Sequence, residues 1–167
     1  MSDMSYPPPL YDGEHGEVSA TVRAGSAGPE LTYPNGNRVH YLSTGASTGG
    51  LFGLYRWEFA PGRSGPDAHF HRTLTESFYI LSGEVTVYDG TAWRVTRPGD
   101  YLHVPAGGLH GFRNDSGAEA SMLLHFAPGA PREGYFEGLA RVAAGETMTD
   151  AEREEFMRYH DNHWVDG

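Results

Sequence analysis

The sequence predicts an all-β fold, a sandwich or a barrel, and three observations indicate it. Glycine and proline, 23 and 11 of the 167 residues, interrupt the chain at short intervals between residues 25 and 131. The short runs between these breaks are rich in aromatic and β-branched side chains. Turn signals such as Asp89-Gly90 separate the runs. Short, regularly spaced strands with turns between them are typical of sandwiches and barrels.

Nine segments have the composition of strands, and each lies between two turn signals. The expected strands are 38–43, 52–60, 68–71, 76–82, 84–89, 92–96, 100–105, 109–114 and 119–127. Asp89-Gly90 predicts a two-residue hairpin turn, because glycine tolerates the positive φ that such turns need. The segment 34–37 predicts another hairpin, and 97–100 predicts a β-turn with proline at its second position.

The two ends of the chain differ from the middle. Residues 1–20 contain three consecutive prolines and predict an extended N-terminal arm. Residues 21–130 then form the β-barrel, and residues 131–167 form a C-terminal helical extension. We expect this extension to pack on the barrel.

Two helices are expected in the extension. The segment 133–143 places apolar residues at helical spacing. Thr149 and Glu152 fit a capping box at the start of a second helix, where each side chain satisfies a free backbone amide. The side chains expected to pack against the barrel from this second helix and its tail are Phe156, Met157, Tyr159 and Trp164.

The composition excludes several classes of protein. The formal net charge is -10, all 12 basic residues are arginine, and no basic stripe indicates binding to nucleic acid. No apolar run approaches the ~20 residues of a membrane-spanning helix. The N-terminus lacks the basic and apolar regions of a secretory signal, which favours a cytoplasmic protein. The chain has no cysteine, so a metal would be held by His, Asp or Glu.

The segment "AHFHRTLTE", residues 68–76, carries the first candidate ligands. Residues two apart in a strand point to the same face, so His69 and His71 project together. If the chain reverses at residues 72–75, Glu76 returns on the neighbouring strand close to His71. Two imidazoles and one carboxylate then converge, a donor set that suits a divalent transition metal with open positions.

A second segment, "GDYLHVPAGGLHGFRN", residues 99–114, follows the pattern G-x₅-P-x-G-x₂-H-x₃-N. Together the two segments resemble the paired motifs of the cupin superfamily, over roughly residues 38–127. The first of these motifs reads G-x₅-H-x-H-x₃₋₄-E-x₆-G, and Gly62 lies one residue upstream of the place of its first glycine. The resemblance implies a double-stranded β-helix, the jelly-roll form of a small barrel. It also implies four metal ligands, which are His69, His71, Glu76 and His110.

The resemblance implies one divalent transition metal per chain, and iron, manganese, nickel, cobalt, copper and zinc all suit such ligands. Glu76 is the candidate catalytic residue, because a carboxylate that loosens from the metal can take a proton from a substrate hydroxyl. Phe78 lies two residues after Glu76, and Phe112 lies two residues after His110. Residues two apart in a strand point to the same face, so we expect both phenylalanines in the substrate pocket. The remaining histidines lack partners at ligand spacing, although His103 or His125 could line the cavity.

The segments "TGG" at 48–50, "ESFYILSGE" at 76–84 and the helix after the barrel resemble bacterial quercetin 2,3-dioxygenase-like cupins. This implies a dioxygenase that acts on a flavonol or another hydroxylated aromatic or enolic small molecule, with dioxygen as co-substrate. The alternatives are a non-oxidative cupin, such as a polyketide cyclase or an isomerase, and a cupin that binds a small molecule without catalysis. Cupins commonly dimerise, so a homodimer is expected.

Overall fold

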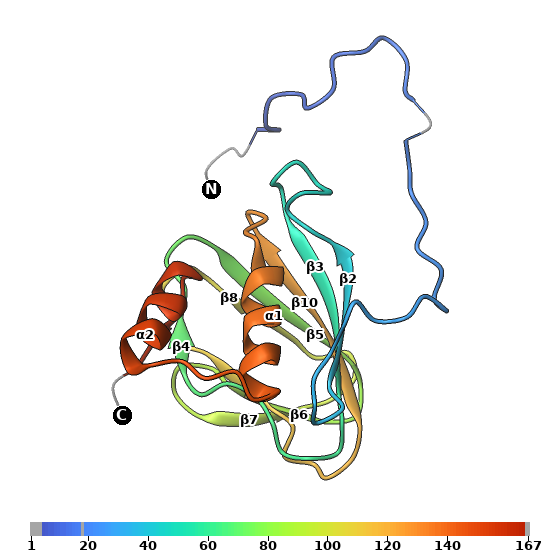
Figure 1. The fold of residues 1–167 in the computed structure, drawn as a ribbon. Coiled ribbons are helices and arrows are strands. Elements are labelled where there is room, and N and C mark those ends of the chain that lie inside the picture. The colour runs from blue at the N-terminus through green and yellow to red at the C-terminus, as the bar shows by residue number, and fades with distance from the viewer. Residues whose placement is uncertain (1–4, 18, 166–167) are drawn as a thin grey trace.

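The computed structural model describes residues 5–17 and 19–165 and shows a barrel of antiparallel strands with two helices after it (Figure 1). The predicted fold class, an all-β jelly roll with C-terminal helices, is confirmed. The strands are β1 Leu31–Thr32, β2 Arg38–Ser43, β3 Gly53–Phe59, β4 His69–Phe70, β5 Thr75–Ser82, β6 Val85–Tyr88, β7 Trp93–Thr96, β8 Tyr101–Val104, β9 Gly111–Arg113, β10 Ala120–Ala127 and β11 His163–Trp164.

Three sheets make up the barrel, and every strand pair is antiparallel. The largest has the order β1-β2-β3-β10-β5-β8, the second β7-β6-β9, and the third consists of β11 and β4. All nine expected strands are present, with bounds that differ by up to two residues. The two-residue strands β1 and β11 are too short for a periodic pattern, and the sequence did not predict them.

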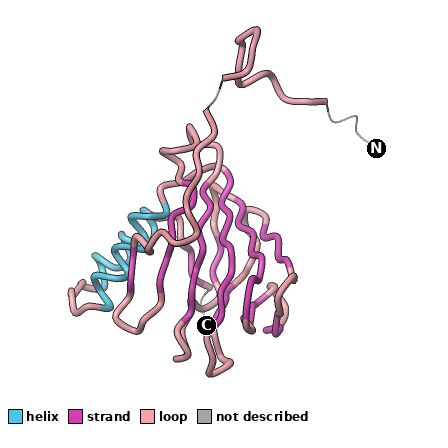
Figure 2. The backbone as a smooth tube through the Cα atoms, turned by 90° about the vertical axis from the view of Figure 1, so that its right-hand side faces the viewer, coloured by secondary structure: helices cyan, strands magenta, loops and turns pink. Residues whose placement is uncertain are grey.

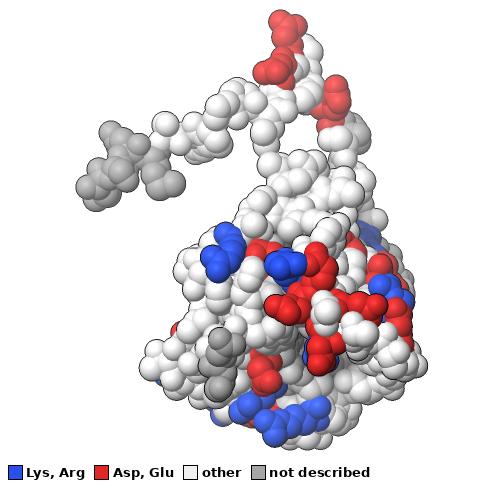
Figure 3. All heavy atoms as spheres, turned by 60° about the vertical axis from the view of Figure 1, so that its left-hand side comes forward, with Lys and Arg blue, Asp and Glu red and all other residues white. Residues whose placement is uncertain are grey.

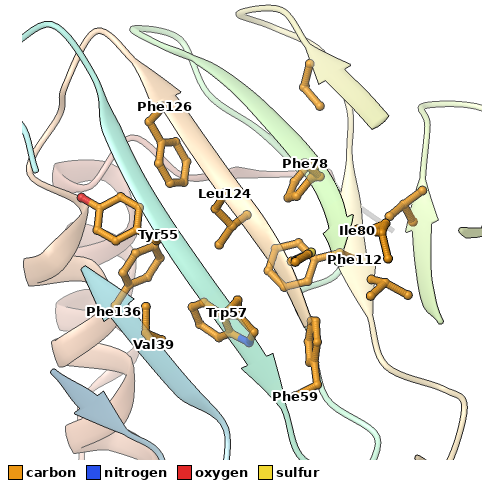
Figure 4. Close-up of a cluster of buried hydrophobic side chains, with 14 of the residues drawn as sticks. Val39, Tyr55, Trp57, Phe59, Phe78, Ile80, Phe112, Leu124, Phe126 and Phe136 are labelled. Atoms are coloured by element: carbon orange, nitrogen blue, oxygen red, sulfur yellow. The ribbon is translucent and has the colours of Figure 1, made fainter. Parts of the chain in front are cut away.

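Alternating side chains explain how the large sheet encloses the core. Along β3, every second residue is buried, beginning with Gly53 and continuing through Tyr55, Trp57 and Phe59. The neighbouring β10 alternates in the same way. Figure 4 shows these side chains together with Phe112 from β9 of the second sheet, so both sheets contribute to one aromatic core.

The expected turns occur at the predicted places, with one shift. Asp100 N donates to Arg97 O at 2.9 Å, which closes the predicted β-turn. The hairpin between β6 and β7 closes through Asp89 N and Ala92 O at 3.2 Å, so its tip is Gly90 and Thr91, one residue later than predicted. Gly90 has a φ of 91°, the conformation for which glycine was expected here.

The helix α1, Arg132–Ala143, covers one face of the barrel (Figures 1 and 2). Its buried Phe136 contacts the barrel core, with ring centroids 5.3 Å from Tyr55 and 5.4 Å from Trp57. These edge-to-face contacts fix the helix against β3. The prediction of a helix that packs on the barrel is confirmed for α1.

The helix α2, Asp150–Tyr159, begins with the predicted capping box. Glu152 N donates to Thr149 Oγ1 at 3.1 Å, and Thr149 N donates to Glu152 Oε2 at 2.9 Å. Met157 is buried as expected, but Tyr159 is 77% exposed, so the prediction that it packs against the barrel is wrong. Residues two apart on a helix point in nearly opposite directions, and only one of these two can face the barrel.

The N-terminal segment has no regular secondary structure between residues 5 and 17 or between 19 and 30, and it extends away from the barrel (Figures 1 and 2). The division at residues 20 and 130 stays a prediction. In the part of the chain that the structure describes, neither helix has the length and apolar character needed to span a bilayer.

Candidate metal centre

Backbone pairing brings two of the predicted ligands together. His69 N donates to His110 O at 2.9 Å, and His110 N donates to His69 O at 3.0 Å. Their rings lie 4.3 Å apart between centroids. His71, two residues along the chain, has its ring 5.1 Å from that of His69 and 5.0 Å from that of His110. The predicted projection of His69 and His71 to one side is therefore observed.

Glu76 approaches the three histidines from β5 of the large sheet. Its Oε2 lies 3.0 Å from His71 Nε2 and 2.7 Å from His110 Nε2. The prediction that Glu76 returns on the strand paired with 68–71 is wrong, because β5 pairs with β10 and β8 while β4 pairs with β11. The carboxylate meets the histidines across the barrel interior instead.

The four side chains form a closely spaced, buried group. One ligand atom from each lies within 4.8 Å of the others, and each residue is at most 5% exposed. Bonds from a transition metal to nitrogen or oxygen are about 2.0–2.2 Å, so ligands of one ion lie within about 4 Å of each other. The group is thus close to coordination geometry, and its N/O donor set fits a divalent transition metal.

Each histidine is oriented by a backbone carbonyl. The Nδ1 atoms of His69, His71 and His110 lie 2.8, 2.7 and 2.9 Å from the carbonyl oxygens of Asp67, Asp161 and Gly108. A carbonyl only accepts, so each Nδ1 carries a proton and Nε2 is the atom of each ring that remains to bind a metal. Without a metal, the Nε2 atoms of His71 and His110 face Glu76 Oε2 as hydrogen-bond donors.

Charge and burial set the protonation of the group. Burial lowers the pKa of His69 to about 3, and neighbouring His110 adds to the effect, so His69 is neutral near pH 7. Burial alone would raise the pKa of Glu76, but His110 and His71 outweigh it and hold that pKa below the usual range. Burial likewise opposes protonation of His110, yet Glu76 raises its pKa. Glu76 is therefore a carboxylate ready to bind a cation.

A cavity of about 270 Å³ opens beside the group, and His69, His71 and Glu76 lie in its wall. Most of the wall is apolar and includes Phe112, one of the two predicted pocket residues. Phe78 is not in the wall; its ring lies 6.0 Å from that of His110 and 5.5 Å from that of Phe112, behind both.

The two strand histidines considered as further cavity residues lie elsewhere. His103 contacts Ser77 Oγ at 3.3 Å, and His125 stacks on Phe52 with ring centroids 5.5 Å apart. Neither lies in the wall of the cavity.

The C-terminal residues contribute more to the centre than the sequence indicated. Trp164 pairs with His69 across the β11–β4 ladder, and their rings lie 5.1 Å apart. Asp161 supplies the carbonyl that orients His71, and its φ of 56° is a conformation that aspartate tolerates better than most residues. Arg132 lies in the cavity wall at the start of α1, where a cation is unusual because it opposes the helix dipole. A basic residue at the start of a helix is the one feature of the sequence that could have drawn attention to Arg132.

Comparison with known proteins agrees with this architecture. The family model described as "Cupin domain" matches residues 55–126. Quercetin 2,3-dioxygenase of Bacillus subtilis (strain 168) is 33% identical over 102 residues, which cover 60% of this chain and 29% of that protein. The match thus spans less than a third of that relative.

Solved structures show the same fold at low identity. An RmlC-like cupin from Shewanella frigidimarina NCIMB 400 aligns with a TM-score of 0.57 at 20% identity, over 70% of this chain and 96% of that one. A predicted oxalate decarboxylase from Thermotoga maritima aligns with a TM-score of 0.56 at 22% identity, over 65% of this chain and 99% of that one.

Proposed function

Because the chain belongs to the cupin superfamily, we propose that it is a metal-dependent dioxygenase that acts on a flavonol-like or other hydroxylated aromatic or enolic small molecule. The observation that carries this proposal is the group of His69, His71, Glu76 and His110 beside a mostly apolar cavity. Each chain would hold one divalent transition metal. A homodimer and a cytoplasmic location remain predictions.

The bound metal would supply a Lewis acid that binds a substrate oxygen and brings dioxygen to it. Three Nε2 atoms and the carboxylate of Glu76 would hold it, because each Nδ1 already donates to a carbonyl.

Glu76 is the proposed proton acceptor for the substrate hydroxyl. Its contacts with His71 and His110 both use Oε2, which leaves Oε1 without a hydrogen bond in the described residues. A hydroxyl at the cavity end nearest the ligands could transfer its proton to Oε1. The substrate would then be an oxyanion, which is easier to oxidise than the neutral hydroxyl.

Aromatic side chains would orient a planar substrate. Trp57, Phe112 and Phe126 lie in the cavity wall together with Phe136 from α1. Flat apolar walls favour a flat ring, and they exclude water from the reacting atoms. The volume of about 270 Å³ favours a small substrate.

The first test is metal content by mass spectrometry on protein purified without an affinity tag. We expect about one metal per chain in the wild type and loss of the metal in a His69→Ala, His110→Ala double variant. A His103→Ala, His125→Ala variant is the matched control, because these strand histidines lie outside the ligand group.

The second test is oxygen uptake by the metal-loaded protein with the flavonol quercetin and with simpler catechols and enols. Uptake that requires substrate and metal supports the dioxygenase. Product formation under anaerobic conditions would contradict it and favour the cyclase or isomerase alternative. A wild-type protein that takes up no metal would contradict the metalloenzyme proposal altogether.

A further inference from the structure

Arg132, the first residue of α1, has a role that the metal site does not explain. Its side chain is buried, with only 4% of the residue exposed, and it lies in the wall of the same cavity as His71 and Glu76. Its guanidinium carbon lies 5.3 Å from the ring centroid of Phe126 and 4.6 Å from that of Tyr135. A positive charge is thus held between aromatic rings next to the candidate metal centre.

The hydrogen bonds of Arg132 leave part of the guanidinium free. The side chain donates to the carbonyl of His160 and, at 3.2 Å, to Asn162 Oδ1. A guanidinium has five N–H donors, so these two bonds leave three, and Nε is buried without a partner in the described residues. Trp57 Nε1, from another residue of the cavity wall, is buried and without a partner as well. Two buried donors from residues of the cavity wall therefore lack acceptors among the described residues.

Arg132 also lacks a counter-ion in direct contact with it. Within residues 5–17 and 19–165, no carboxylate forms an ion pair with it, and burial lowers its pKa. The acidic groups whose charge reaches it are Glu76 and Asp161. Glu76 contacts two histidines, and the Asp161 carboxylate accepts from the backbone N–H groups of residues 72 and 73 and from the Thr73 hydroxyl. A buried cation without a contacting counter-ion is costly, so an anion bound beside it would be stabilised.

The cavity differs in charge from the rest of the protein. The chain has a net charge of -10, and Figure 3 shows many acidic side chains on one face and on the N-terminal segment. In the cavity wall, however, Glu76 is the one carboxylate among the described residues, whereas Arg132 and Arg153 are both present. A divalent metal would make the cavity more positive still, so a negatively charged ligand is favoured there.

We propose that Arg132 binds a carboxylate of the substrate and so determines specificity for hydroxylated aromatic or enolic acids over neutral analogues. The substrate would place a hydroxyl oxygen at the ligand group and its carboxylate at Arg132, whose planar donors match carboxylate geometry. This inference rests on the proposed function, since it assigns a second anchoring point to the same site.

The test compares 3,4-dihydroxybenzoate with its methyl ester, which keeps the catechol and lacks the negative charge. Dissociation constants are measured by isothermal titration calorimetry on metal-loaded protein with oxygen excluded. We expect the acid to bind at least about tenfold more tightly than the ester in the wild type. Arg132→Gln should abolish this preference, and Arg132→Lys should reduce it, because the charge remains but the planar donors are lost.

Arg141→Gln is the matched control, because Arg141 is an exposed arginine at the other end of α1 and pairs with Glu146. It should keep the wild-type preference. Arg132 also holds the C-terminal turn, so each variant is first checked by thermal unfolding and metal content. A purely structural role would weaken the binding of acid and ester equally and leave their ratio unchanged.

The outcomes separate the inference from the proposed function. Equal affinity for acid and ester in the wild type would overturn the role of Arg132 while the dioxygenase proposal stands. A preference that persists in folded Arg132→Gln would overturn it too. If neither probe binds, the inference about Arg132 fails and the dioxygenase proposal is decided by oxygen uptake with quercetin. If both probes bind equally well without metal, the proposed metal-dependent function fails and this inference fails with it.

Discussion

Replacing Asp161 with alanine tests whether the turn after α2 holds His71 in position. The carbonyl of Asp161 accepts from His71 Nδ1 at 2.7 Å. Its carboxylate accepts from Arg72 N at 3.0 Å, from Thr73 N at 2.9 Å and from Thr73 Oγ1 at 2.7 Å. The side chain therefore ties the turn to the segment that directly follows His71, and its loss should loosen both.

The magnitude follows from these contacts. A hydrogen bond to a charged group contributes about 1.5–3 kcal/mol, but bonds that share one carboxylate do not add fully. Alanine at a φ of 56° costs about 1 kcal/mol more. We expect Asp161→Ala to lower the free energy of unfolding by about 3 kcal/mol and to weaken metal binding about 10- to 100-fold. Asp161→Asn keeps an acceptor and tolerates this φ, so its effects should be about half as large in free energy.

Two assays separate these effects. Urea unfolding of the metal-free protein measures stability, and competition with a chelating indicator measures the metal dissociation constant. Asp115→Ala is the control, because Asp115 forms partly exposed ion pairs with Arg63 and Arg113, and none of these residues lies in the cavity wall. Its effect should stay below about 1 kcal/mol, without a change in metal affinity.

Two results would refute the reasoning. If Asp161→Ala binds metal within about twofold of the wild type, the turn does not orient His71. If its loss of stability is no greater than that of Asp115→Ala, the hydrogen bonds of the carboxylate do not hold the turn.

Three further predictions concern the ligand group, acid stability and a glycine. Glu76→Gln should weaken metal binding by at least about 100-fold, measured by chelator competition, because a neutral amide replaces the one anionic ligand; unchanged affinity would remove Glu76 from the site. The pKa of Asp161 is lowered from 3.8 to about 2, mainly through hydrogen bonds that outweigh burial, so its stabilisation is complete above about pH 4 and is lost as the pH falls toward 2. Urea unfolding at a series of pH values should show that the free energy of unfolding falls by about 1 kcal/mol less for Asp161→Asn than for the wild type as the pH falls over that range. Parallel pH dependence of the two proteins would contradict the lowered pKa of Asp161. Gly65→Ala should destabilise by about 3 kcal/mol or more, because a Cβ there would lie 2.0 Å from the carbonyl oxygen of Phe112; Gly117→Ala, with open space around it, should cost only about 1 kcal/mol in the same thermal unfolding assay.

The sequence alone determined the elements that depend on neighbouring residues. Composition and flanking turn signals predicted a strand at 52–60, and β3 lies there with Tyr55, Trp57 and Phe59 buried on one face. Thr149 and Glu152 predicted a capping box that the structure contains. The spacing of His69 and His71 predicted their common direction. Such features follow from backbone geometry over a few residues, so a short pattern is enough to reveal them.

Resemblance to a family added the one long-range element of the site that the pattern alone could not supply. His110 is 34 residues from Glu76, and no local period connects them, yet their side chains lie 2.7 Å apart. The paired motifs identified this partner because they describe two distant segments together. They did not identify the strand pairing, since Glu76 meets the histidines across the barrel and not from the next strand.

Tertiary structure alone decided how the C-terminal extension takes part in the site. The pairing of β11 with β4, the carbonyl of Asp161 on His71 and the burial of Arg132 join residues far apart in the chain. Every residue has a backbone carbonyl, so the sequence cannot mark which one will meet a histidine. Only closure of the barrel and docking of the two helices bring these groups together. For that reason the surroundings of the candidate ligand group were not predictable, although the four residues that come together in it were named from the sequence.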